Sequence, residues 1–107
     1  LLTYHPWLSR NLQKDFNGIP SPLNHKQIAP KEISLLLIPA LAVDNNGIRL
    51  GYGGGYFDRL RAKKEWNLIP AYVILPRACI SKESLPRESW DIPFNGWINE
   101  EGLTKLI

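Results

Sequence analysis

Two short apolar segments, residues 33–38 and 71–75, constrain the fold most strongly. The first shows no polar alternation after Ser34, and the second shows none. Pro39 follows the first segment and Pro76 follows the second. Such segments are typical of strands in a parallel sheet that is covered on both faces. Between them, residues 56–66 contain no Gly or Pro and many good helix formers, which predicts a helix. A strand, a helix and a strand in this order indicate a right-handed parallel crossover and an α/β fold.

Shorter signals fill in the remaining elements. The pair Asn46-Gly47 readily adopts positive φ, so we expect a tight hairpin turn between residues 41–43 and 48–50. Residues 96–99 predict a last short strand, and residues 100–107 a terminal helix or tail.

Composition excludes several classes of protein. The 107 residues suit one domain, and no apolar run approaches the roughly 18 residues of a membrane span. A formal charge of +3 is too small to indicate nucleic-acid binding. Cys79 is the sole cysteine, so nothing requires an oxidising compartment, and it is interpreted as an apolar filler. No His or Cys cluster has zinc spacing.

The segment with chemical information is the glycine cluster at residues 51–55. Four of its five residues are Gly, and ordering glycine loses more backbone entropy than ordering any other residue. Such a segment is useful where the chain turns sharply or where a ligand must approach the main chain. Its free N–H groups can bind an anion, and a helix starting near Tyr56 would add to that site. A polyphosphate is the natural ligand, and a purely structural strand-to-helix turn is the alternative.

Two familiar phosphate loops do not match. A P-loop requires Lys-Ser/Thr after its glycines, and none follows here. The dinucleotide fingerprint G-x-G-x-x-G needs a glycine at position 56 or 58, where Tyr56 and Asp58 stand.

Charged residues surround the cluster. From Arg49 to Lys64 there are five basic residues and one acid, Asp58. The basic residues indicate either a phosphate ligand or a solvated helix face. Asp58 either complements the start of a helix or binds a Mg²⁺ that bridges phosphate oxygens, and Asp91 is a candidate second carboxylate for the same metal.

Residues 49–58 resemble the Arg-Leu-Gly-x-Gly-x-Gly-Tyr-Tyr-Asp signature of the 5-formyltetrahydrofolate cyclo-ligase family. Residues 39–44 match the preceding Pro-x-Leu-Ala-x-Asp of that family, and residues 18–22 and 91–93 resemble an upstream and a late element. The resemblance covers roughly residues 18 to 104. Three positions depart from it: Tyr52 stands where Arg or Lys is frequent, Phe57 replaces the second Tyr, and Trp90 replaces a His.

The resemblance implies a three-layer α/β/α fold with a mainly parallel sheet, of the NagB/RpiA/CoA transferase-like kind. The family domain is nearly twice as long, so residues 1–107 would be the C-terminal portion of one incomplete domain. The implied activity is the ATP- and Mg²⁺-dependent cyclisation of 5-formyltetrahydrofolate to 5,10-methenyltetrahydrofolate, releasing ADP and phosphate. The implied protein is cytoplasmic and monomeric, with no membrane or nucleic-acid partner.

The resemblance also implies residue roles. The catalytic residues would be Arg49 and Tyr56, and the metal ligands Asp58 and Asp91. Nucleotide binding would involve Arg49, Leu50, Gly51, Tyr52, Gly53, Gly54, Gly55, Tyr56 and Phe57. The competing hypothesis is a truncated, non-catalytic relative that acts as a nucleotide- or RNA-binding module.

Overall fold

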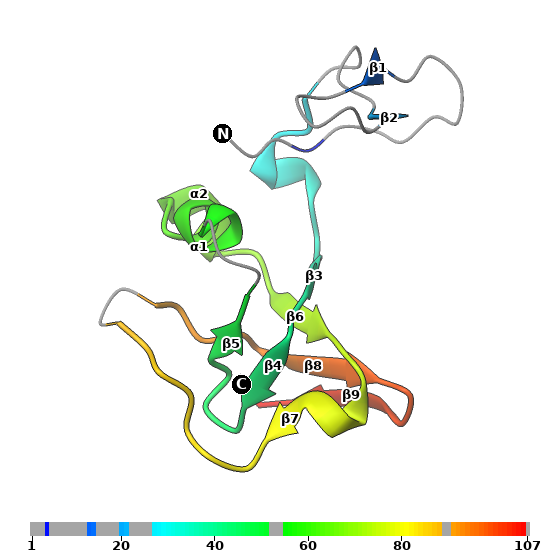
Figure 1. The fold of residues 1–107 in the computed structure, drawn as a ribbon. Coiled ribbons are helices and arrows are strands. Elements are labelled where there is room, and N and C mark those ends of the chain that lie inside the picture. Colours follow the sequence, from blue (N-terminus) through cyan, green and yellow to red (C-terminus); the bar gives the residue numbers. More distant parts are fainter. Residues whose placement is uncertain are drawn as a thin grey trace.

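A computed structural model describes residue 4 and residues 13–14, 20–21, 27–51, 55–88 and 91–106. Within these ranges the chain combines short helices with three sheets (Figure 1). The helical elements are η1 (Pro30–Glu32), α1 (Tyr56–Arg61), α2 (Lys64–Asn67) and η2 (Arg77–Cys79). The strands are β1 (Gln13–Lys14), β2 (Pro20–Ser21), β3 (Leu36–Pro39), β4 (Ala42–Asp44), β5 (Arg49–Leu50), β6 (Ala71–Ile74), β7 (Ile80–Ser81), β8 (Gly96–Asn99) and β9 (Gly102–Lys105).

The main sheet has the strand order β3-β6-β8-β9. Strand β6 pairs in parallel with β3 on one side and with β8 on the other, and β9 runs antiparallel to β8. The sheet is therefore mainly parallel, and the predicted α/β class is confirmed. Strands β3 and β6 are the two apolar segments of the sequence, separated along the chain by α1 and α2.

A second sheet, β5-β4-β7, carries the hairpin that the sequence predicted. Strands β4 and β5 pair antiparallel, with Val43 opposite Arg49. The turn between them contains Gly47 at φ +77° and is closed by a hydrogen bond from the Gly47 amide to the Asp44 carbonyl of 3.0 Å. The glycine cluster begins directly after β5, the second strand of this hairpin.

The core lies between the helices and one face of the main sheet. Leu60 of α1 and Trp66 of α2 belong to the same buried cluster as Ile38 and Val73 of the sheet. On β3, Leu36 and Ile38 are buried, whereas Leu37 is 47% exposed. The prediction that this strand is covered on both faces is therefore wrong for the described structure, because its burial alternates.

Two predicted helices also differ from the structure. The helix expected over residues 56–66 is interrupted at Lys63, whose extended backbone separates α1 from α2. The interruption accompanies the packing of Trp66 against Tyr4, with ring centroids 5.4 Å apart. The terminal helix or tail expected over residues 100–107 is instead largely strand β9, which pairs antiparallel with β8. Within the described ranges, no helix has the length and apolar character needed to span a membrane.

Candidate functional site

Arg49 joins the three elements around the glycine cluster. It lies on β5, and its Nη1 donates a hydrogen bond of 3.1 Å to the carbonyl of Pro39, the last residue of β3. Its Cζ lies 5.5 Å from the centroid of the Phe57 ring on α1, a cation–π distance. The guanidinium is therefore held at the carboxyl end of β3, the end at which open α/β sheets usually bind ligands.

Gly51 is a glycine because the Arg49 side chain lies against its backbone. A Cβ on Gly51 would come within 2.6 Å of Arg49 Nη2 and 2.9 Å of Arg49 Cζ. No carbon atom tolerates that approach, so any other residue at position 51 would displace the guanidinium. Gly51 and Arg49 thus form one structural unit.

If the glycine cluster binds ATP, as the sequence resemblance implies, Gly51→Ala should weaken that binding several-fold and leave stability nearly unchanged. The atom that must move is the end of a flexible side chain, which costs little in folding but removes Arg49 from its position. Calorimetric titration with MgATP and thermal unfolding measure the two effects. In an Arg49→Ala background the same substitution should have no further effect on binding; an additive loss would mean that Gly51 does not act through Arg49.

Gly55 makes the turn into α1. Its φ of +64° and ψ of +25° place it in the left-handed region, which favours glycine, and its carbonyl accepts the Arg59 amide at 3.0 Å. With six residues, α1 is shorter than predicted, so its dipole adds less to an anion site than expected. The predicted site residues Tyr52, Gly53 and Gly54 lie outside the described residues.

The predicted site residues after the glycines face solvent to different degrees. Tyr56 is 57% exposed, with Arg59 Cζ 5.2 Å from its ring centroid, and Phe57 is half-buried beneath Arg49. Asp58 is exposed in the first turn of α1, and Leu50 is 48% exposed. The Tyr56 phenol and the Asp58 carboxylate are therefore both open to solvent on α1, the helix whose Phe57 contacts Arg49.

Asp91 is more constrained than Asp58. Its Oδ2 accepts the Glu88 amide at 2.7 Å, its own amide donates to the Glu88 carbonyl at 3.0 Å, and its carbonyl accepts Arg87 Nη2 at 3.1 Å. One carboxylate oxygen is therefore already engaged in a local turn. The other is the oxygen that remains for a metal.

Both carboxylates have the donor chemistry that Mg²⁺ prefers. Among the described residues no group of three or more His, Cys, Asp or Glu gathers into a metal cluster. Mg²⁺ in nucleotide sites is usually held by one or two carboxylates together with phosphates and water, so such a cluster is not required. The exposed Asp58 fits this role best.

Arg61 is a residue of this region whose position the sequence did not predict. As part of a basic run it was expected on a phosphate or in solvent, yet it is 3% exposed. Its Nη1 and Nη2 donate to the carbonyls of Ile92 (3.0 Å) and Pro93 (3.2 Å), and its Cζ lies 4.0 Å from the Phe94 ring centroid. Burial lowers the pKa of Arg61 to about 10, with Asp58 opposing and Arg49 reinforcing that effect. It is therefore still charged at neutral pH.

Asp44 is a second residue whose structural role the sequence did not predict. It is 1% exposed, and its carboxylate accepts the amides of Asn46 (2.9 Å), Ile48 (3.0 Å) and Leu85 (2.7 Å). It fixes the β4–β5 hairpin to the segment that leads toward Asp91. The sequence feature that could have indicated this role is the position of the aspartate directly before Asn-Asn-Gly, the predicted turn.

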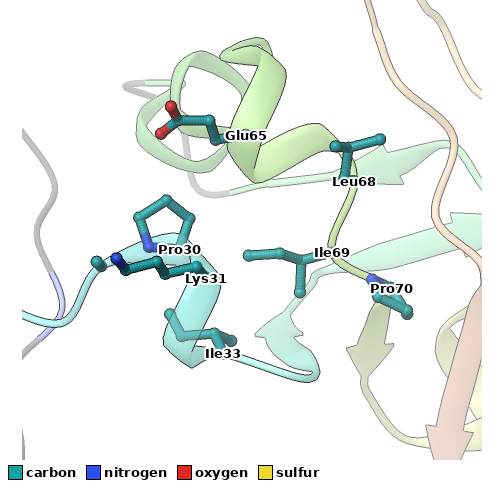
Figure 2. Close-up of a pocket in the computed structure, with 8 residues that line it drawn as sticks. Pro30, Lys31, Ile33, Glu65, Leu68, Ile69 and Pro70 are labelled. Carbon is teal, nitrogen blue, oxygen red and sulfur yellow. The ribbon is translucent and has the colours of Figure 1, made fainter.

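A hollow of ≈ 580 Å³ lies away from these residues. Figure 2 shows Ile33 and Ile69 beside it, with Lys31 and Glu65 at its margin. Ile33 precedes β3 and Pro70 precedes β6, so the hollow is at the amino ends of these parallel strands. It is therefore separate from the Arg49 region, which lies at the opposite end of β3.

The sequence matches a known protein family over nearly its whole length. A sequence model described as the 5-formyltetrahydrofolate cyclo-ligase family matches residues 1–99. A 5-formyltetrahydrofolate cyclo-ligase of Haemophilus influenzae is 42% identical over 79 residues, covering 71% of this chain and 41% of that protein. One of Escherichia coli K12 is 36% identical over 95 residues, covering 86% and 50%.

Solved structures agree with this result. The 5,10-methenyltetrahydrofolate synthetase of Aquifex aeolicus superposes with a TM-score of 0.67 at 27% identity, covering 92% of this chain and 49% of that chain. The synthetase of Mycoplasma pneumoniae gives a TM-score of 0.61 at 26% identity, covering 73% and 46%. The chain therefore spans about half the length of the relatives it matches.

Proposed function

Because the chain belongs to the 5-formyltetrahydrofolate cyclo-ligase family, we propose that it supplies the phosphate-binding part of an enzyme that uses MgATP to close 5-formyltetrahydrofolate to 5,10-methenyltetrahydrofolate. In this reaction the formyl oxygen takes the γ-phosphoryl group of ATP. N10 then attacks the activated carbon, and phosphate leaves as the methenyl bridge forms. ADP and phosphate are the other products, and the reaction is proposed to take place in the cytoplasm in a monomeric protein.

The observation that supports this most strongly is the position of Arg49 against Gly51, at the carboxyl end of β3. Phosphoryl transfer depends on positioning and charge neutralisation more than on covalent help from the protein. Arg49 brings a guanidinium, which suits phosphate oxygens, and the glycine cluster brings backbone amides. Tyr56, exposed on α1, would stack on or hydrogen bond to the folate.

Mg²⁺ would be held by Asp58, with the remaining oxygen of Asp91 as a second ligand. When bound, Mg²⁺ neutralises charge on the phosphate oxygens. Leu50, Gly51 and Phe57, with the other residues of the glycine cluster, would surround the nucleotide. Asp58, which is exposed and directly follows Phe57, would act on the same phosphates through the metal.

Calorimetric titration of the protein with MgATP, and then with 5-formyltetrahydrofolate in its presence, tests this proposal. We expect saturable MgATP binding that is weakened when Arg49 is replaced by Ala. Appearance of 5,10-methenyltetrahydrofolate, followed by its absorbance, would establish the reaction itself. Binding of neither ligand would contradict the proposal.

The competing proposal is a relative that binds the nucleotide without catalysis. MgATP binding without formation of the methenyl product would identify this alternative.

A further inference from the structure

Arg61 is a buried cation that contacts main-chain carbonyls instead of solvent or ligand. Its planar guanidinium directs one N–H donor to Ile92 and another to Pro93, at 3.0 and 3.2 Å. Burying a charged group is unfavourable unless it is well hydrogen-bonded, and Arg61 Nε has no partner among the described residues. An apolar side chain would fill this space with less desolvation. The presence of an arginine here therefore indicates that the protein requires the hydrogen bonds that link α1 to the main chain of residues 92–93.

That connection joins the two carboxylates considered as metal ligands. Arg61 follows Asp58 by three residues on α1, so both side chains lie on the same side of the helix. Ile92 and Pro93, whose carbonyls it binds, directly follow Asp91. The guanidinium thus bridges the element that carries Asp58 and the segment that carries Asp91.

The segment after Asp91 is held firmly on its other sides. The Phe94 amide donates to the Gly47 carbonyl at 2.8 Å, and the Asn95 amide donates to the Ala71 carbonyl at 2.8 Å. Phe94 is 1% exposed, and its ring lies beneath the Arg61 guanidinium at 4.0 Å. Through its two hydrogen bonds and the Phe94 ring, Arg61 ties this fixed segment to α1.

From this geometry we infer that Arg61 is a positioning residue that sets Asp91 relative to Asp58 and so tunes the binding of Mg²⁺ with the nucleotide. The inference rests on the proposed function. Because Arg61 uses its N–H donors on the carbonyls of Ile92 and Pro93, it would act on the metal through the position of Asp91 and not by direct contact. Groups that orient metal ligands typically change metal affinity about 10- to 100-fold when they are removed.

The test compares the affinity of the protein for MgATP with its affinity for ATP in the presence of EDTA, both by calorimetry. We expect Arg61→Met to lower the ratio of these affinities at least about tenfold. Arg61→Lys, which keeps the charge but can reach one carbonyl, should lower the ratio less and should remain folded. Lys64→Met, which removes an exposed cation from α2, should leave the ratio unchanged.

Two further variants separate positioning from general stability. In an Asp91→Asn background, whose amide oxygen can still accept the Glu88 amide, Arg61→Met should not change the ratio further. A variant that unfolds at lower temperature but keeps the wild-type ratio would overturn the inference, as would a full additional loss in the Asp91→Asn background. In both of these outcomes the wild-type protein still binds MgATP, so the proposed function stands. If the wild type does not bind MgATP, the proposed function is overturned, and this inference with it.

Discussion

Replacing Asp44 by alanine will lower the free energy of unfolding by about 3–5 kcal/mol, because three backbone amides lose their acceptor at once. The Ile48 amide is buried, and an unsatisfied buried donor costs about 1–3 kcal/mol. The amides of Asn46 and Leu85 are partly buried and will cost less. Chemical denaturation of the wild type and the variant measures the difference.

Two control variants make this prediction specific. Asp44→Asn keeps one acceptor oxygen and should fall between the wild type and Asp44→Ala. Glu32→Ala removes another carboxylate that accepts a backbone amide, that of Ala29 at 2.7 Å, but this contact is exposed and should cost about 1 kcal/mol or less. An Asp44→Ala protein within about 1 kcal/mol of the wild type would show that this carboxylate does not hold the hairpin to the Leu85 segment.

Replacing Asp58 by asparagine will lower the affinity for MgATP at least about tenfold, equivalent to about 1.4 kcal/mol. The substitution keeps the shape of the side chain and removes the charge that would bind Mg²⁺. Affinity for ATP in the presence of EDTA should stay the same or rise slightly, since a carboxylate no longer faces the phosphates. Calorimetry with and without the metal measures both values.

The alternative role of Asp58 is electrostatic support of the protein itself. Asp58 favours the charged form of Arg61 and lies in the first turn of α1, where a carboxylate contributes about 0.3–1 kcal/mol. If that is its whole role, Asp58→Asn will lower stability slightly and leave the ratio of MgATP to ATP affinity unchanged. Glu65→Gln, an exposed carboxylate on α2, is the matched control and should alter neither.

The local elements were those that the sequence could predict. The Asn46-Gly47 pair specified the β4–β5 hairpin, and the apolar segments specified the parallel strands β3 and β6. Strand β9 was missed because its hairpin turn contains Glu100 and Glu101 and none of the usual Asn-Gly or Asp-Gly pairs. It forms because β8 offers a free edge, which no local pattern records.

The candidate site was predictable in its glycines and in its family resemblance, but its internal connections were not. The burial of Arg61 depends on carbonyls 31 and 32 residues away along the chain. The role of Asp44 depends in the same way on the Leu85 amide, 41 residues away. Both are tertiary contacts, and the sequence around each residue favours an exposed polar side chain as readily as a buried one.

The most direct test of the central claim, that backbone around the glycine cluster binds the phosphates of the nucleotide, is a titration of the ¹⁵N-labelled protein with MgATP followed by ¹H–¹⁵N correlation spectra. We predict that the amides of Gly51, Gly55 and Tyr56 show the largest shifts, and that Arg49→Ala reduces them. Amides beside the hollow at the opposite end of β3, such as those of Ile33 and Ile69, should stay unchanged. Shifts confined to the hollow, with Gly51 and Gly55 unaffected, would contradict the claim.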